Sequence, residues 1–302
     1  HAAEILPFPH ASLSGRERPA RQGVCYKAGS SPLARHSRKG RGAGRLKRVN
    51  MMAALSEIGI LETGRPPEDL ASGFGDYPAF VRQWLKPLNA RFRTYAVLDG
   101  ELPASPADAD LWVITGSRFG VYEDHAFIPP LEEFIRACAR DGAKMFGICF
   151  GHQIIAQAMG GTVRKSDKGW GVGIHDYQVV DWPGAPEHRP QALDIQAYHQ
   201  DQVIVPPPGT RRIATSDFCP NAGLWYPGFA VTVQGHPEFP ADYAEALIKA
   251  RRSTSLGEAV ADKALATVHN PSNAGALAQL VGDLFDAPKA ATAEPVGGKA
   301  AD

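Results

Sequence analysis

The stretch from residue 143 to residue 161 constrains this chain more than any other, because it joins a short apolar strand to an apolar helix through one cysteine. Cys149 stands between Gly147 and Gly151, two residues away from each. Gly-x-Cys-x-Gly is the cysteine form of a nucleophile elbow, a strand-to-helix turn so tight that only glycine fits beside the exposed nucleophile. A helix N-terminus also favours thiolate over thiol. The spacing therefore favours a reactive Cys149 over the alternative, a buried structural cysteine.

A second segment places a histidine and a carboxylate at the end of another apolar strand. The alternating run 230–234 is followed by Gly-His-Pro-Glu, with the imidazole at His236 and the carboxylate at Glu238. Residues two apart in an extended chain lie on the same side. This segment would therefore deliver His236 to the sulfur of Cys149, and Glu238 to the far nitrogen of the imidazole. A Cys-His-Glu set of this kind is a catalytic triad, which is recognised by the roles of its members and not by their order in the sequence. His236 would be the general base and acid, and Glu238 would orient it.

The two segments carry a family resemblance. Gly147-Ile-Cys-Phe-Gly-His-Gln153 and Gln234-Gly-His-Pro-Glu238 resemble the signature segments of class I glutamine amidotransferase domains. The similarity covers roughly residues 55–250 and is strongest to the stand-alone branch, which is similar to the glutaminase half of GMP synthase and includes plant γ-glutamyl peptidases. The resemblance implies a flavodoxin-like α/β fold and hydrolysis of a γ-glutamyl amide through a thioester on Cys149.

A third segment supports the resemblance. The apolar strand 111–115 ends in a turn, where family members supply backbone N–H groups to an oxyanion hole. Such donors stabilise the charge of the tetrahedral intermediate. The usual family turn is Ser-Gly-Gly-Pro, whereas this chain has Thr-Gly-Ser-Arg. That departure leaves open whether Gly116 or Ser117 donates, and Phe150 would supply the second N–H. An ordinary strand-to-loop turn remains the alternative.

Three weaker positions follow from the same resemblance. Gln153 resembles the family's contact to the glutamine substrate, and Tyr198 and His199 belong to a segment that resembles a loop touching the α-carbon substituents of the substrate. A solvated turn accounts equally well for that loop. His152 is interpreted as a packing or helix-start residue rather than a second base. Cys138, in an apolar helical run, is expected in the core.

Composition excludes several classes of protein. The chain has 32 basic and 32 acidic residues, but the first fifty hold eleven Lys/Arg against Glu4 and Glu17. The remaining 252 residues therefore carry 21 basic and 30 acidic side chains, a net of −9, which argues against nucleic acid as a partner. No apolar run is long enough for a membrane helix. Four cysteines without zinc-ligand spacing predict no metal and no cofactor, and a reactive thiol fits the reducing cytoplasm.

The chain is predicted to have one domain with extensions. Residues 1–52 are Arg-, Gly- and Ser-rich and precede the first credible strand, so they are expected to be disordered. They are either upstream sequence before a start at Met51 or Met52, a transit peptide, or, less in keeping with the charge, a basic arm for nucleic acid. The amidotransferase-like domain would span 53–252. A helical extension at 253–286 and a flexible tail at 287–302 would follow.

From residue 57 onward, strand and helix patterns alternate. Strands are expected at 57–62, 94–98, 111–115 and 143–148, with helices near 76–88, 127–140, 241–252, 256–268 and 273–285. This order predicts an α/β fold with a mostly parallel central sheet and helices on both faces. The stretch 161–234 is rich in short strand patterns, which predicts added antiparallel strands. Ligands of such sheets bind at the carboxyl ends of the strands.

Three functions remain open on the sequence. The first is a cysteine amidohydrolase of the glutamine amidotransferase type, acting on glutamine or another γ-glutamyl compound. A separate synthase subunit would accept its ammonia, or the enzyme would simply hydrolyse. The second is a γ-glutamyl peptidase that acts on glutathione-like peptides or conjugates. The third is a catalytically idle binding or regulatory protein of the same fold.

Overall fold

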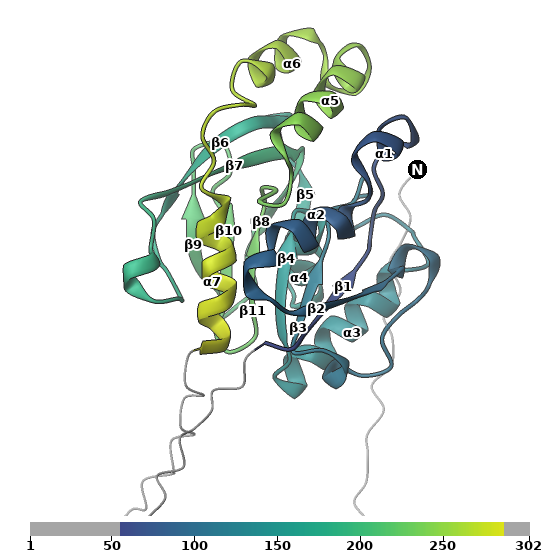
Figure 1. Cartoon of the computed structure of the whole chain (residues 1–302), viewed down its shortest axis with the longest axis vertical. Helices are drawn as coiled ribbons and strands as arrows, with labels where there is room; N and C mark the ends of the chain where they lie inside the picture. The colour runs from purple at the N-terminus through teal and green to yellow at the C-terminus, as the bar shows by residue number, and fades with distance from the viewer. Residues whose placement is uncertain (1–54, 287–302) are drawn as a thin grey trace, which may run out of the picture. The chain divides into compact units, whose positions relative to one another are not determined.

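The computed structural model describes residues 55–286 of the chain (Figure 1). The extension predicted at 1–52, with Cys25, and the tail predicted at 287–302 lie outside the described residues. Within residues 55–286, the predicted α/β architecture is confirmed: helices cover both faces of a large sheet.

Nine strands among the described residues form this sheet in the order β2-β1-β3-β4-β11-β10-β9-β6-β7. The first five run parallel, and β10, β9, β6 and β7 continue the sheet with antiparallel pairs. The bounds in sheet order are Arg91–Tyr95, Glu57–Leu61, Leu111–Ile114, Lys144–Ile148, Ala230–Val233, Gly223–Tyr226, Arg211–Thr215, Gly171–Val179 and Ala192–His199. Strands β5 (Thr162–Lys165) and β8 (Asp201–Val205) pair separately. The parallel half has the 2-1-3-4-5 order of flavodoxin-like folds.

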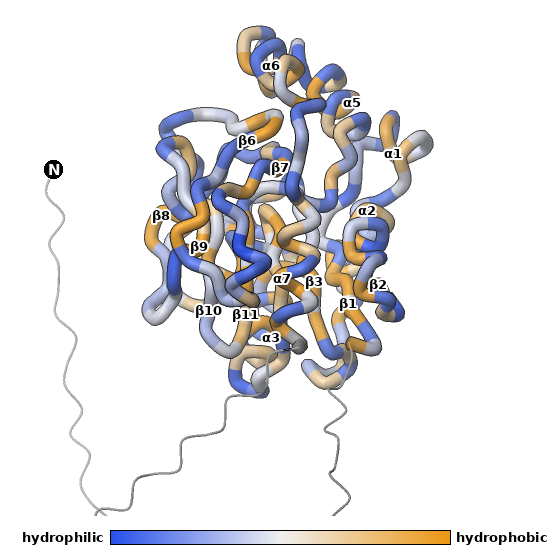
Figure 2. Tube along the Cα trace, turned by 60° about the vertical axis from the view of Figure 1, so that its left-hand side comes forward, coloured by the Kyte–Doolittle hydropathy of each residue, from blue (hydrophilic) through white to orange (hydrophobic). Residues whose placement is uncertain are grey.

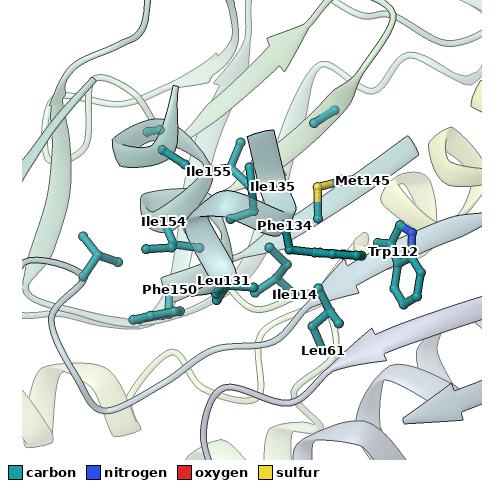
Figure 3. Close-up of a cluster of buried hydrophobic side chains, with 14 of the residues drawn as sticks. Leu61, Trp112, Ile114, Leu131, Phe134, Ile135, Met145, Phe150, Ile154 and Ile155 are labelled. Atoms are coloured by element: carbon teal, nitrogen blue, oxygen red, sulfur yellow. The ribbon is translucent and has the colours of Figure 1, made fainter. Parts of the chain in front are cut away.

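Alternate residues of each parallel strand enter different cores. On one face, Leu61, Trp112 and Ile114 pack against helices α3 and α4, and Figure 3 shows these side chains among the apolar residues of both helices. On the other face, Ile60 and Val113 pack against α2 and α7. Period-2 alternation with both faces apolar is what a sheet buried on both sides requires.

The helices follow the expected alternation. Their bounds are α1 Glu68–Phe74, α2 Tyr77–Trp84, α3 Ile128–Asp141, α4 Phe150–Ala158, α5 Ala241–Arg251, α6 Glu258–Leu265 and α7 Ala274–Asp286. Helices α2 and α7 contact each other across one face of the sheet, and α6 contacts β6 near α5 (Figure 1). Helix α7 contributes Leu277, Leu280 and Val281 to the buried cluster on that face. In Figure 2 the inner strands β1 and β3 are coloured as strongly hydrophobic.

Several predicted boundaries are wrong, each for a local reason. The helix expected over 76–88 ends at Trp84 and gives way to a 3₁₀ turn, because Pro87 cannot continue an α-helix. The strand expected over 94–98 lies at Arg91–Tyr95, and Val97–Asp99 forms a 3₁₀ turn. The helix expected from 256 begins at Glu258, because Gly257 has a φ of 78° that no helix accommodates.

None of the helices within residues 55–286 combines the length and apolar character needed to cross a membrane. The free thiols of Cys138, Cys149 and Cys219 are all buried in this part of the chain. Cys138 lies in α3 with no solvent exposure, which confirms its predicted place in the core. Burial raises the pKa of this thiol to about 12, so it stays protonated at neutral pH.

Candidate active site

Cys149 occupies the tight turn between β4 and α4. Its backbone φ is 51°, in the left-handed region that non-glycine residues rarely adopt. A Cβ at Gly147 would lie 2.6 Å from the Gly151 carbonyl oxygen, and a Cβ at Gly151 would lie 2.5 Å from the Ile114 oxygen. Both positions therefore exclude any side chain, as the Gly-x-Cys-x-Gly spacing predicts. The turn places Cys149 at the N-cap of α4, with its N–H bonded to the Val233 oxygen of β11 at 2.9 Å.

His236 and Glu238 follow the end of the neighbouring strand β11. The His236 Nδ1 and the Glu238 Oε1 lie 2.8 Å apart, and both side chains are buried. The imidazole also stacks on Phe239, with ring centroids 3.9 Å apart, and Cys149 is close enough for its charge to act on the pKa of the ring. Because Nδ1 is committed to Glu238, Nε2 is the nitrogen left for the sulfur. The structure thus brings Cys149, His236 and Glu238 together at the ends of two neighbouring strands, β4 and β11.

The charge of His236 is set by its neighbours. Burial lowers the pKa of the imidazole, but the negative charges of Glu238 and Cys149 outweigh it and raise the pKa to about 10. The site therefore favours an imidazolium beside the sulfur at neutral pH. An imidazolium can give a proton to a leaving group.

One large cleft contains most of the residues that the sequence singled out. Its volume is about 1050 Å³, and it lies at the carboxyl ends of β1, β3, β4 and β11, where ligands of parallel sheets bind. Its lining includes Gly116, Ser117, Cys149, Gln153, Tyr198, His199 and His236. Glu238 and Phe150 lie buried behind this surface.

The turn after β3 lies directly against the imidazole. A Cβ at Gly116 would come within 2.8 Å of the His236 Cε1, so glycine is needed here for the ring to keep its place. The Gly116 oxygen accepts from Thr63 Oγ1 at 3.4 Å, and Ser117 Oγ accepts from the Phe119 N–H at 3.3 Å. Phe150 is the first residue of α4, where backbone N–H groups have no intrahelical partner. The turn and the helix N-terminus together flank Cys149.

Two hydrogen bonds hold the side-chain amide of Gln153, which lines the cleft. Its Nε2 donates to the Asp201 oxygen at 2.9 Å and to the Gln234 Oε1 at 3.2 Å. Both amide hydrogens are therefore used, and any contact of Gln153 with a ligand in the cleft has to be made by its Oε1. That oxygen accepts hydrogen bonds, so it suits a donor such as an ammonium group.

The loop expected at Tyr198 and His199 is not a loop. These residues end strand β7, and Asp201 begins β8, so Gln200 alone joins the two strands. The strand forms because residues 192–199 pair with β6 along almost their whole length, with His199 opposite Gly171. Burial lowers the pKa of His199 to about 3, and its Nδ1 donates to the Asp201 oxygen at 3.2 Å. His199 is therefore neutral at pH 7.

His152 does not face the cleft. It is fully buried in α4, and its Nδ1 lies 2.7 Å from the Thr232 Oγ1. Burial lowers the pKa of His152 to about 3, so it carries no charge at neutral pH. The interpretation of His152 as a packing residue agrees with this position.

Sequence reasoning missed one buried residue that touches the sulfur. Gln234 has no solvent exposure, and its Nε2 lies 3.7 Å from the Cys149 Sγ. The residue stands two positions before His236, inside the second signature segment, so the signal was at hand. The sequence pattern assigns Gln234 to the alternating strand, and its contact with Cys149 depends on which side chains the fold places around it. Over residues 55–286, no cluster of three or more His, Cys, Asp or Glu side chains could hold a metal ion.

Comparisons with known proteins agree with this geometry. Residues 108–249 match the family model described as glutamine amidotransferase class-I. A glutamine amidotransferase-like protein of Schizosaccharomyces pombe is 28% identical over 231 residues, which span 72% of this chain and 93% of that protein. γ-Glutamyl peptidase 5 of Arabidopsis thaliana is 31% identical over 187 residues, 58% of this chain and 73% of that one. The chain therefore belongs to the class I glutamine amidotransferase family.

Solved structures show the same fold. A glutamine amidotransferase from Thermotoga maritima superposes with a TM-score of 0.64, covering 77% of this chain and all but 1% of that one, at 21% identity. The predicted family and fold class are thus confirmed. At the level of the family, the chain is an enzyme of the hydrolase or amidotransferase type.

Proposed function

We propose that the chain is a cysteine-dependent amidohydrolase that cleaves a γ-glutamyl amide through a thioester on Cys149. One observation carries the proposal. Cys149 has a strained backbone and lines the same cleft as His236. The Nδ1 of His236 is bonded to Glu238. A backbone φ in the left-handed region is costly for a cysteine, and such strain clusters at functional sites.

The geometry supports a two-step reaction. The Cys149 thiolate attacks the carbonyl carbon of the γ-amide, and the electron pair of the C=O bond moves onto oxygen. His236 gives its proton to the amine, the C–N bond breaks, and a thioester remains. Water then attacks the thioester, His236 takes the proton, and the thiolate leaves with release of the γ-carboxylate. Glu238 holds the imidazole in position and stabilises its charge.

Backbone N–H groups beside Cys149 would stabilise the oxyanion of both tetrahedral intermediates. The first is that of Phe150, at the start of α4, and the second comes from the turn at Gly116 or Ser117. Each donor of this kind is worth roughly 3 kcal/mol in the transition state. The substrate's ammonium group would bind the Oε1 of Gln153, with Tyr198 and His199 forming the wall opposite.

A second candidate is a γ-glutamyl peptidase that acts on peptides or conjugates. The cleft volume of about 1050 Å³ favours it, because pockets near the top of the 300–1,000 Å³ range hold ligands much larger than one amino acid. The lining beyond the triad includes aromatic and cationic side chains, among them Trp170, Arg118 and Arg251. The named activity of the Arabidopsis relative points the same way.

A hydrolysis screen tests these candidates. Glutamine, γ-glutamyl dipeptides and glutathione conjugates would be assayed side by side, with Cys149→Ala as the control. Preference for glutamine supports an amidotransferase that passes ammonia to a separate synthase subunit, and preference for peptides supports the peptidase. A third candidate, an idle binding protein, requires that no substrate turns over and that a glutamine-analogue diazo-ketone fails to label Cys149. Because Cys149 has to stay a thiol, we place the protein in a reducing compartment such as the cytoplasm.

A further inference from the structure

Gln234 reaches the sulfur of Cys149 through a hydrogen bond whose direction the surrounding structure determines. The chain of contacts begins at the backbone oxygen of Asp201, which can only accept. Gln153 must therefore turn its amide nitrogen toward that oxygen, at 2.9 Å. The second hydrogen of this nitrogen points to the Gln234 Oε1 at 3.2 Å. The Gln234 amide is left with its own nitrogen facing the Cys149 Sγ at 3.7 Å.

The polarity of this chain has a chemical consequence. Gln234 is fully buried and Gln153 is only 3% exposed, so water competes little for the hydrogen bond between them. A flip of the Gln234 amide would set its nitrogen against the Gln153 nitrogen and its oxygen against the sulfur. Both contacts would be repulsive in a site of low dielectric. The sulfur is thus presented with a fixed donor, which stabilises a thiolate more than a thiol.

We infer that Gln234 is a positioning residue for the nucleophile: its amide, oriented by Gln153 and the Asp201 carbonyl, donates to the Cys149 thiolate. This inference rests on the proposed function of Cys149. His236 and Gln234 approach the sulfur as two donors with different properties. The imidazolium can give up its proton during the reaction, whereas the amide keeps its hydrogen throughout and holds the sulfur in place each time the thiolate leaves.

The same carbonyl also accepts from His199. The His199 Nδ1 donates to the Asp201 oxygen at 3.2 Å, so that oxygen uses both lone pairs, one for each donor. The carboxylate of Asp201 accepts from the Tyr122 hydroxyl at 3.0 Å. The junction between β7 and β8 is therefore tied down on both sides. The orientation of Gln234 therefore depends on this junction, through the Gln153 amide.

The test measures alkylation of Cys149 by iodoacetamide as a function of pH, with the modified peptide identified by mass spectrometry. Gln234→Met keeps the volume and removes the donor. Its alkylation profile should move toward higher pH by roughly half to one unit, with alkylation at pH 7 slowed about three- to tenfold. Gln153→Met, which frees the Gln234 amide to rotate, should move the profile in the same direction by less.

Gln202→Met is the matched control. Gln202 is equally buried, and its amide donates to the Phe218 oxygen at 3.2 Å, away from Cys149. It should lose stability without moving the alkylation profile. Profiles that stay at the wild-type position in both the Gln234 and the Gln153 variants would overturn the inference. Hydrolysis retained in Cys149→Ala would instead overturn the proposed function, so the two failures are distinguishable.

Discussion

In the parallel half of the sheet, the turns after β3, β4 and β11 carry Gly116, Cys149 and His236 to one edge. In the antiparallel half, β7 delivers Tyr198 and His199 to the same cleft by pairing with β6. The first half thus supplies the groups that we propose take part in the reaction, each placed by a short turn of the chain. The second supplies part of the cleft wall, fixed by the antiparallel pairing of β6 with β7, the next strand along the chain.

The two halves meet at His236. Its backbone N–H donates to the Gln196 oxygen of β7 at 2.7 Å, so the imidazole follows a parallel strand but is anchored to an antiparallel one. Substitutions in the parallel half should therefore affect the chemical step. Substitutions in the antiparallel half should affect substrate binding, except where they move His236.

The largest expected effect is at the nucleophile. Cys149→Ala should lower kcat by roughly 10⁴-fold or more, because no covalent intermediate can form, while the thermal midpoint stays near that of the wild type. Cys149→Ser should be nearly as inactive. Steady-state kinetics and circular dichroism would be compared, and an Ala variant that keeps more than about a hundredth of the rate would remove Cys149 from the mechanism.

Substitutions at His236 and Glu238 should lower kcat by different amounts, because the two residues have different proposed roles. His236→Ala should cost roughly 10³-fold or more in kcat, because proton transfer in both steps is lost. Glu238→Gln should cost less, because loss of the orienting acid of such a set costs less than loss of the base itself. Turnover of both variants is the measurement. Equal losses would indicate that the carboxylate has chemistry of its own, and no loss in either would show that the motif match is accidental.

A smaller effect is expected at the turn after β3. A methyl group at Gly116 would meet the His236 Cε1 at 2.8 Å, so Gly116→Ala should displace the imidazole and lower kcat by about 10- to 100-fold. Gly275→Ala, in α7 with nothing within 4 Å of the added Cβ, is the control and should keep full activity. Similar rates for the two variants would show that the ring has room to move.

The pH dependence follows from the raised pKa of His236. Its imidazolium is present at neutral pH and loses its proton as the pH rises through about 10, so kcat/KM should fall about tenfold per unit above that point. Glu238→Gln removes one of the two negative charges that raise this pKa. The alkaline limb of that variant should therefore lie at lower pH. A limb that stays in place would mean another group titrates there.

The smallest effect is expected in the antiparallel half. Tyr198 packs against Trp170, with ring centroids 5.5 Å apart, and lines the cleft. Tyr198→Leu should raise KM about three- to tenfold by loss of aromatic contact area, and leave kcat nearly unchanged. Initial-rate kinetics over a range of substrate concentration would test this. A fall in kcat as large as that of Gly116→Ala would erase the distinction between the two halves.

The sequence by itself determined the parts of this protein that depend on local geometry. The turn at Cys149 leaves no room for a side chain at positions 147 and 151, and the two glycines show this requirement in the sequence alone. His236 and Glu238 are two residues apart, so their contact at 2.8 Å is also a short-range property. The alternation of strands and helices predicted the α/β class for the same reason.

Only the tertiary structure decided the rest. Strand β7 went unpredicted because residues 192–199 mix polar and apolar side chains, and strand propensity depends on the neighbouring strand. Helix α7 was expected as part of an extension, yet its apolar side packs on the sheet. Gln234 donates to Cys149 only because Gln153 and the Asp201 carbonyl fix its amide. Each of these depends on which distant residue lies opposite, and no local pattern encodes that.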